Sequence, residues 1–178
     1  MDTEIDGLLT RWLEGDRQAG DRLFSILYQE LRRLARSQLR HHPKGRTLDT
    51  TALLHEAFLK MMRGSPRQVL DRGHFLALAS RVMRQILMDG LRRKSTSKRD
   101  AGELLALDTD PPAPVARSSE DLLALDKALL KLESLDARLA QMVDLRFFGG
   151  MSVEETAEAM GISSATLDRK STRLNSSH

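Results

Sequence analysis

Apolar residues recur every three or four positions along most of the chain. This spacing is the period of an amphipathic helix, and it differs from the strict alternation typical of a half-buried strand. The predicted helical stretches are residues 5–13, 24–35, 50–62, 74–91, 122–132 and 139–147. Short polar side chains cap helices by accepting hydrogen bonds from free amides, so we expect Asp21 to cap the second stretch. Asp49 or Thr50 would cap the third, and Ser134 or Asp136 the last. The pattern predicts an all-α fold.

Residues 152–169, SVEETAEAMGISSATLDR, form a separate pattern near the end of the chain. Thr156, Ala157 and Met160 follow helical spacing. Gly161 can supply the left-handed backbone of a tight turn, and Ser163 can cap a second short helix. Two short helices joined in this way predict a helix-turn-helix, whose second helix normally enters the DNA major groove. An ordinary corner between two helices of a bundle is the alternative interpretation.

A shift in composition divides the chain. Residues 108–114, DTDPPAP, hold three of the five prolines and two acids, without helical periodicity. Prolines at this density cannot continue a helix, and they stiffen a linker. We therefore predict two small helical domains, 1–99 and 118–169, joined by the Pro-rich linker 100–117, with the helix-turn-helix at the end of the second domain. Ser118 would cap the first helix of that domain.

Composition excludes several classes of protein. The 178 residues include no cysteine, which rules out disulfides and thiolate metal sites. Hydrophobic residues make up 40% and aromatic residues 4%, so the core must consist mainly of aliphatic side chains. No long apolar run follows a basic start, so we expect neither a signal peptide nor a membrane span. We therefore expect a cytoplasmic protein.

The cations are clustered, although the formal net charge is only +3. Residues 32–46 carry six arginines and lysines and no acid, and residues 81–99 carry seven against Asp89 alone. Residues 120–158 are rich in acids by contrast. Clustered cations are the electrostatic footprint of a nucleic-acid binder. For either cluster, a solvated basic face without a partner is the alternative.

No combination of residues predicts catalysis. His55-Glu56 matches half of a zinc-protease helix, but no second histidine follows at the required spacing. His41 and His42 are adjacent and so point in different directions on a helix, which does not favour a metal site. An enzyme built around His55 and Glu56 would also lack a nucleophile and a Gly-rich phosphate loop. We expect no catalytic residue, metal or cofactor, and we expect Glu56 and Lys60, four positions apart, to pair on an exposed face.

The stretch 74–91 carries the candidate nucleic-acid chemistry. Its apolar residues predict one buried side, whereas Arg81, Arg84 and Gln85 share a different face before the chain runs into further basic residues. Arginine and glutamine are side chains that contact phosphates and base edges. A helix with a well-solvated basic side is the alternative.

Four segments together carry a family resemblance. They are ELRRLARSQL (30–39), TTALLHEAFLKM (50–61), HFLALASRVMRQILMDGLRRKSTSKR (74–99) and LDARLAQMVDLRFFGGMSVEETAEAMGISSATLDR (135–169). In this order, with the Pro-rich acidic linker between them, they resemble a bacterial RNA polymerase sigma factor of the extracytoplasmic-function (ECF) type of the sigma-70 family. The resemblance runs from about Leu8 to Arg169, and it depends on order and spacing more than on any single motif.

The resemblance implies that domain 1–99 is sigma region 2. The helix over 50–61 would bind core RNA polymerase, with Glu56 and Lys60 as contacts, and the helix over 74–99 would meet the minus-ten promoter element. Capturing an unpaired base takes a polar pocket and a cationic groove. By position, the base-side group is Arg81, Arg84, Gln85 and Asp89, and the backbone group is Arg92, Arg93, Lys94, Lys98 and Arg99.

Domain 118–169 would be sigma region 4, which reads the minus-thirty-five element as duplex DNA. Its residues towards the groove would be Ser164, Thr166, Arg169 and Lys170. The linker would run along the RNA exit path of the polymerase. The implied partners are core RNA polymerase and promoter DNA, with an anti-sigma factor as a further candidate, and the protein would have no catalytic activity or membrane partner. The alternative is a stand-alone helix-turn-helix regulator that acts without being a polymerase subunit.

Residues 170–178, KSTRLNSSH, depart from the alternation of basic and apolar residues with which the family continues its recognition helix. They resemble translated adapter or frameshifted sequence, and a frayed native tail is the alternative. In either case we expect weakened binding of the upstream element.

Overall fold

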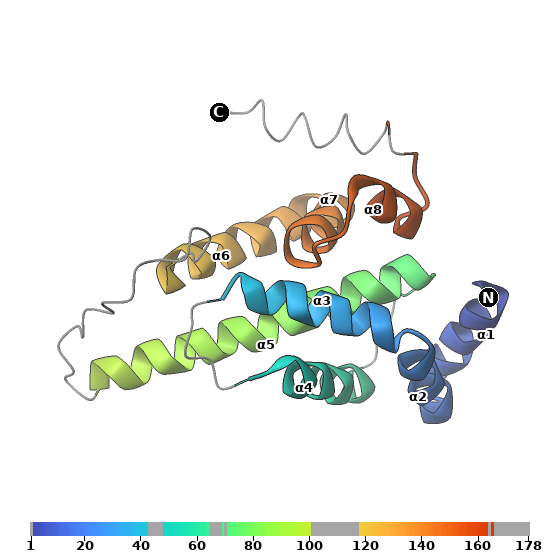
Figure 1. Ribbon diagram of the computed structural model, residues 1–178, viewed down its shortest axis with the longest axis horizontal. Coiled ribbons are helices and arrows are strands. Elements are labelled where there is room, and N and C mark those ends of the chain that lie inside the picture. Colours follow the sequence, from blue (N-terminus) through green and yellow to red (C-terminus); the bar gives the residue numbers. More distant parts are fainter. Residues whose placement is uncertain are drawn as a thin grey trace.

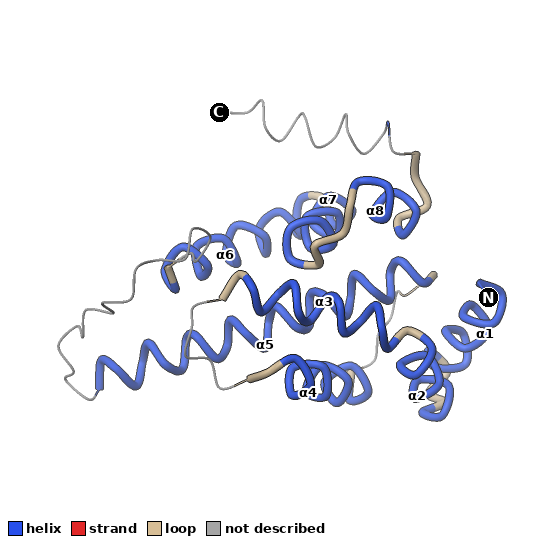
Figure 2. Tube along the Cα trace, viewed as in Figure 1, coloured by secondary structure: helices blue, strands red, loops and turns tan. Residues whose placement is uncertain are grey.

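The computed structural model describes residues 2–42, 48–64, 69, 71–100, 118–163 and 165. Every regular element in these ranges is helical, which confirms the predicted all-α class (Figures 1 and 2). The elements are α1 Asp2–Leu13, α2 Arg17–Ile26, α3 Tyr28–Arg40, α4 Thr50–Arg63, α5 Arg72–Asp100, α6 Ser119–Leu135, α7 Ala137–Val143, the π-helical turn η1 Asp144–Phe148 and α8 Val153–Ala159. Within the described ranges, no helix is both long enough and apolar enough to cross a bilayer.

Capping side chains fix where several helices begin, because they accept hydrogen bonds from amides that have no partner within the helix. The Asp49 carboxylate accepts from the Ala52 amide at 2.8 Å at the start of α4. The Asp136 carboxylate does the same for Leu139 at 2.9 Å at the start of α7. At Ser118 the hydroxyl caps α6 in a reciprocal capping box. These three caps were predicted from the sequence.

The prediction for the second helix was wrong. Asp16 caps α2 by accepting from the amides of Gln18 and Ala19, whereas Asp21 lies inside that helix. The single helix expected over 24–35 is two helices. The helix is interrupted at Leu27, where the backbone angles (φ −92°, ψ 9°) are not those of an α-helix. The break turns the chain so that α2 packs against both α1 and α4.

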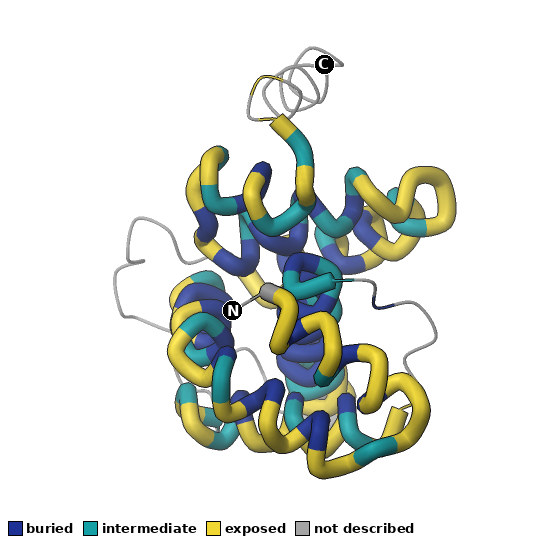
Figure 3. The backbone as a smooth tube through the Cα atoms, turned by 90° about the vertical axis from the view of Figure 1, so that its right-hand side faces the viewer, coloured by how far each residue is buried: buried dark blue, intermediate teal, exposed yellow. Residues whose placement is uncertain are grey.

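The long helix α5 is the centre of the fold. In Figure 1, α4 lies below α5, while α6, α7 and α8 lie above it, and α3 also packs against it. Its residue Phe75 is fully buried and meets the edge of Trp12, with 5.5 Å between ring centroids. Buried residues line the faces that the helices turn towards one another, and exposed residues line their outer faces (Figure 3). Leu145 and Met151, from the second predicted domain, belong to the same apolar core as the first.

Two close backbone approaches join the halves that precede and follow residues 101–117. A Cβ atom on Gly73 of α5 would overlap the carbonyl group of Ala159 in α8. Gly150 has a φ of +65°, and a Cβ atom there would lie 2.5 Å from the hydroxyl of Ser37 in α3. The two halves of the described chain therefore pack without room for added side-chain atoms at these points. Their division into domains 1–99 and 118–169 stays a prediction, and residues 101–117 of the expected linker lie outside the described residues.

Candidate nucleic-acid interface

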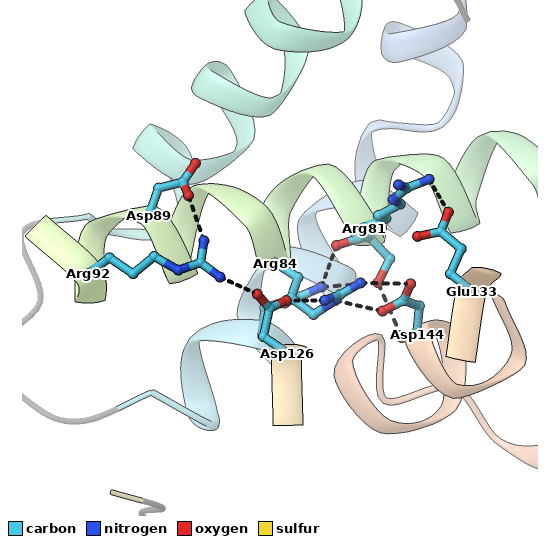
Figure 4. A network of polar contacts seen from close by, with 9 residues as sticks. Arg81, Arg84, Asp89, Arg92, Asp126, Glu133 and Asp144 are labelled. Carbon is cyan, nitrogen blue, oxygen red and sulfur yellow. Dashed lines mark hydrogen bonds and ion pairs between the residues drawn. The ribbon is translucent and has the colours of Figure 1, made fainter. Parts of the chain in front are cut away.

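Helix α5 positions the candidate promoter-binding side chains. It begins where the Asp71 carboxylate accepts from the His74 amide at 2.8 Å, and it continues for 29 residues. Ion-pairing arginines of α5 face α6 and η1, as Figure 4 shows. Part of the candidate nucleic-acid surface is therefore covered by the second half of the chain.

Arg84 is at the centre of this covered surface and is only 1% exposed. Its Nε donates to Asp144 Oδ1 at 2.9 Å, and its Nη2 lies 3.4 Å from Asp144 Oδ2. Nη1 of the same guanidinium donates to Asp126 Oδ1, which belongs to α6. The guanidinium also lies over the ring of Phe148, 5.5 Å from its centroid. Arg84 is thus held between two buried carboxylates and an aromatic face.

Burial sets the charge state of this network. Removal from water raises the pKa of the Asp144 carboxyl above its usual value, and the positive charge and hydrogen bonds of Arg84 oppose part of that rise. The Asp144 backbone carbonyl accepts from Ser80 Oγ at 3.2 Å, and the Ser80 carbonyl in turn accepts from Gln38 Nε2 at 2.7 Å. A buried polar chain therefore links α3, α5 and η1.

The other residues of the predicted base-side group lie around Arg84. Arg81 is half-buried and forms an ion pair with Glu133 of α6. Gln85 is also half-buried. Asp89 accepts from Arg92 at 3.0 Å within α5. The structure therefore places the group on one helix, and the second half of the chain covers Arg84, which is 1% exposed. The role of these four residues in base contact stays a prediction.

The predicted backbone group lies towards the C-terminal end of α5. The side chain of Arg92 is 45% exposed, and its Nη2 donates to Asp126 Oδ2 at 2.6 Å. Arg93 and Lys94 are exposed. The side chains of Lys98 and Arg99 lie outside the described residues. Residues 92–94 are exposed whereas residues 82–84 are buried, so the described end of α5 is less covered than its middle.

The predicted polymerase contacts lie on α4. Glu56 and Lys60 are both exposed. Within the described residues Lys60 pairs with Asp89 of α5, with 3.9 Å between Nζ and Oδ2, and not with Glu56 as the spacing predicted. Beside this helix, a hollow of about 300 Å³ between α2 and α4 is lined partly by Phe58, Leu59 and Met62.

The first helix of the predicted helix-turn-helix is present as α8. Ser152 and Glu155 form a capping box at its start, and Thr156 and Ala157 are buried. Gly161 has the left-handed backbone that the sequence predicted, with a φ of +60°. The four residues expected towards the DNA groove lie outside the described residues: Ser164, Thr166, Arg169 and Lys170. The same holds for the segment 170–178.

Sequence reasoning missed the acids that hold the covered face. Asp126 and Asp144 are 2% and 4% exposed, and both lie within stretches that were interpreted only for their leucines and other apolar residues. The available signal was an aspartate close to the buried side of an amphipathic helix, where an unpaired charge is costly. Such a position requires a cationic partner elsewhere in the chain. Within the described ranges, no group of three or more potential ligands could hold a metal ion.

Comparison with known proteins adds one finding to this geometry. The family model described as "ECF sigma factor" matches residues 2–174, and so extends into the segment 170–178. Neither the curated proteins nor the solved structures compared with the chain gave a match.

Proposed function

The chain belongs to the ECF sigma factor family, and from this premise we propose how its parts divide the work of promoter recognition. It is a sigma factor, which directs RNA polymerase to promoters and initiates transcription, and its family consists of non-catalytic transcription factors. The match over residues 2–174 is the observation that carries this conclusion. A stand-alone helix-turn-helix regulator is not favoured, because the match includes the first half of the chain as well as the second.

The first half, residues 1–99, would act as region 2 and bind the minus-ten element through α5. Arg93 and Lys94 support this assignment, because both are exposed at the basic end of the helix. Cations in such positions hold the phosphate backbone, and each phosphate contact releases counterions. Arg92, Lys98 and Arg99 would complete this group. The residues proposed for base contacts are Arg81, Arg84, Gln85 and Asp89.

Helix α4 would contact core RNA polymerase. Glu56 and Lys60 are exposed on it, and Leu59 is 38% exposed beside them. An exposed apolar side chain between charged ones is typical of the edge of a protein interface. The hollow between α2 and α4 gives a partner side chain room to enter next to these residues.

The second half, residues 118–169, would act as region 4 and read the minus-thirty-five element. Its proposed contacts, Ser164, Thr166, Arg169 and Lys170, rest on the sequence and the family. The linker 100–117 would follow the RNA exit path. An anti-sigma factor is a proposed further partner, and the cytoplasm the proposed location, since promoter-bound polymerase works there.

The test is capture of core RNA polymerase by the tagged protein, followed by run-off transcription from a cognate promoter. Core binding and promoter-dependent transcripts are expected. Tight duplex binding by a protein that ignores the core enzyme would contradict the assignment.

The Arg93→Ala variant tests the backbone group on α5. Loss of one phosphate contact should weaken promoter binding by the holoenzyme and reduce the slope of log affinity against log salt by about one. Arg22→Ala is the matched control, because Arg22 is an exposed arginine of α2, far from the basic end of α5 in the chain. Equal effects of the two substitutions would remove Arg93 from the proposed site.

A further inference from the structure

Helix α3 carries a row of arginines to which the proposed function gives no role. Arg33, Arg36 and Arg40 are exposed, and their spacing of three and four residues places them on one face of the helix. Arg32 is half-buried at the edge of the same face. These arginines belong to the basic cluster at residues 32–46, which lies outside α5. We call the three exposed side chains the α3 row.

Acids neutralise little of the α3 row. Glu30 is the single acid of α3, and it is engaged elsewhere, because its Oε1 accepts from Arg72 Nη2 of α5 at 2.7 Å. Arg33 Nη1 donates to Glu155 Oε1 of α8 at 2.8 Å. Only one arginine of the row is therefore paired within the described residues.

The other two arginines have no role in the stability of the helix. Arg36 and Arg40 form no ion pair with any residue that the structure describes. Arg40 lies in the last turn of α3, where a cation complements the helix dipole, but Arg36 precedes that turn. Like charges four positions apart on a helix repel each other and destabilise it slightly. The fold thus tolerates this pair of charges without gaining from it.

We propose that the α3 row binds the phosphate backbone of a nucleic acid. With a rise of about 1.5 Å per residue, Arg33 to Arg40 spans about 10 Å. One DNA strand advances about 3.4 Å for each phosphate, so the row matches about three consecutive phosphates. Guanidinium groups bind phosphates through forked hydrogen bonds. The identity of this polyanion as promoter DNA rests on the proposed function, and the row adds to the backbone contacts proposed for α5.

The surroundings of the row favour a polyanion over a protein partner. Beyond Tyr28, the apolar residues of α3 are all buried: Leu31, Leu34, Ala35 and Leu39. The row therefore has no apolar or aromatic side chain of its helix beside it to anchor a protein interface. Phosphate contacts need no such anchor. Helix α3 packs alongside α5 (Figure 1), and Arg36 and Arg40 stay exposed with both halves of the chain in place, so the free chain can bind through them.

The salt dependence of non-specific binding tests the proposal on the full-length free chain. The probes are a fluorescent DNA duplex of mixed sequence and one of its single strands, followed by anisotropy over a range of salt concentrations. Each lost phosphate contact lowers the slope of log affinity against log salt by about 0.9 on a duplex and about 0.7 on a single strand. Arg36→Ala with Arg40→Ala should therefore lower it by about 1.8 or about 1.4. A response on the duplex assigns the row to paired DNA, and a response on the single strand alone assigns it to the opened promoter.

Lys127→Ala with Lys131→Ala is the matched control. These lysines are exposed on α6 at the same spacing of four, and their replacement removes the same number of charges. It should change the slope less than the arginine substitutions do. Arg36→Lys with Arg40→Lys keeps both charges and should keep the wild-type slope. Urea unfolding checks that each variant remains folded.

The same variants carry over to the holoenzyme on a cognate promoter. Arg36→Ala with Arg40→Ala should weaken promoter binding and leave the affinity for core RNA polymerase unchanged. A slope equal to that of the wild type on both probes, or changed no more than by the lysine control, would overturn the proposal. Loss of affinity for core RNA polymerase with an unchanged slope would overturn it too, because the row would then contact an acidic protein surface.

Failure of the proposed function would look different. A wild-type chain that does not bind core RNA polymerase would contradict that function. The salt slopes of the free chain need neither polymerase nor a known promoter, so they would still show whether the α3 row binds phosphates.

Discussion

Replacing Arg84 with methionine should strongly destabilise the protein at neutral pH. Methionine retains much of the length of the side chain and its contact with Phe148, but it leaves Asp144 buried without a cation. Removing one partner of a buried ion pair costs about 3–5 kcal/mol. The loss of stability cannot exceed the free energy that holds the two halves together, because separation of the halves returns the carboxylates to water. The two possible responses are therefore a lower free energy of unfolding or a larger fraction of molecules in which the two halves have separated.

Urea unfolding gives the first quantity. Energy transfer between dyes on Ser25→Cys and Ala128→Cys, exposed positions in the first and the second half, reports the second. Arg92→Ala is the control, because Arg92 is 45% exposed and an exposed pair contributes at most about 1 kcal/mol. Adding Asp144→Leu to Arg84→Met should recover most of the loss, since it removes the uncompensated charge and Asp126 keeps Arg92. An Arg84→Met protein that matches Arg92→Ala in urea and keeps the wild-type dye separation would refute the buried network.

The pH dependence of the same variant has a defined sign. Burial already raises the pKa of Asp144 above 3.8, and loss of the opposing Arg84 charge should raise it further. As the pH falls through this raised pKa, the folded state takes up a proton that the unfolded state does not yet bind. The free energy of unfolding of Arg84→Met should therefore recover towards that of the wild type in mildly acidic buffer. If the difference in free energy of unfolding between Arg84→Met and the wild type stays constant with pH, the lost stability comes from packing and not from the charge on Asp144.

Three further predictions concern local structure, each measured by urea unfolding. The hydrogen bond from Arg11 lowers the pKa of Asp16 below 3.8, so the stability that the charged cap contributes is present above that pH and is lost below it. Wild type and Asp16→Asn should accordingly converge between about pH 5 and pH 2. Gly150→Ala should cost about 1–3 kcal/mol, because φ is +65° and the new Cβ meets Ser37; a stability equal to wild type would contradict the close approach. Asp49→Ala should cost about 0.5–2 kcal/mol through loss of the α4 cap, whereas Asp49→Asn should cost little.

The fold could be predicted as far as local rules decide it. Helical spacing of apolar residues identified the helices, and the caps at Asp49, Ser118 and Asp136 lie where short polar side chains precede an apolar run. The break at Leu27 escaped prediction because the apolar pattern continues across it without glycine or proline. Such a break depends on how α2 and α3 pack against the rest of the protein, and this is a tertiary effect.

The candidate site, like the fold, could be predicted from the sequence only in part. Its basic residues on α5 were evident from charge and periodicity. Their partners Asp126 and Asp144 are 42 and 60 positions away from Arg84 in the chain, so no local pattern connects them. Whether a cation faces water or a carboxylate depends on where a distant helix packs, and only the structure provides that. The left-handed turn at Gly161 was predictable, because a tight turn after a short helix favours glycine.

Within the described residues, each ion pair between the halves takes its arginine from the first half and its acid from the second, and this arrangement would affect how quickly the protein finds DNA. In this structure, four acids of the second half neutralise arginines of the first at short range. Separation turns this local neutrality into two regions of opposite potential. The positive region then attracts a polyanion over a Debye length or more and accelerates encounter, and this acceleration falls with ionic strength. A chain whose halves are in contact would diffuse past DNA with little long-range attraction from these arginines, whereas a chain whose halves had separated would be steered towards DNA.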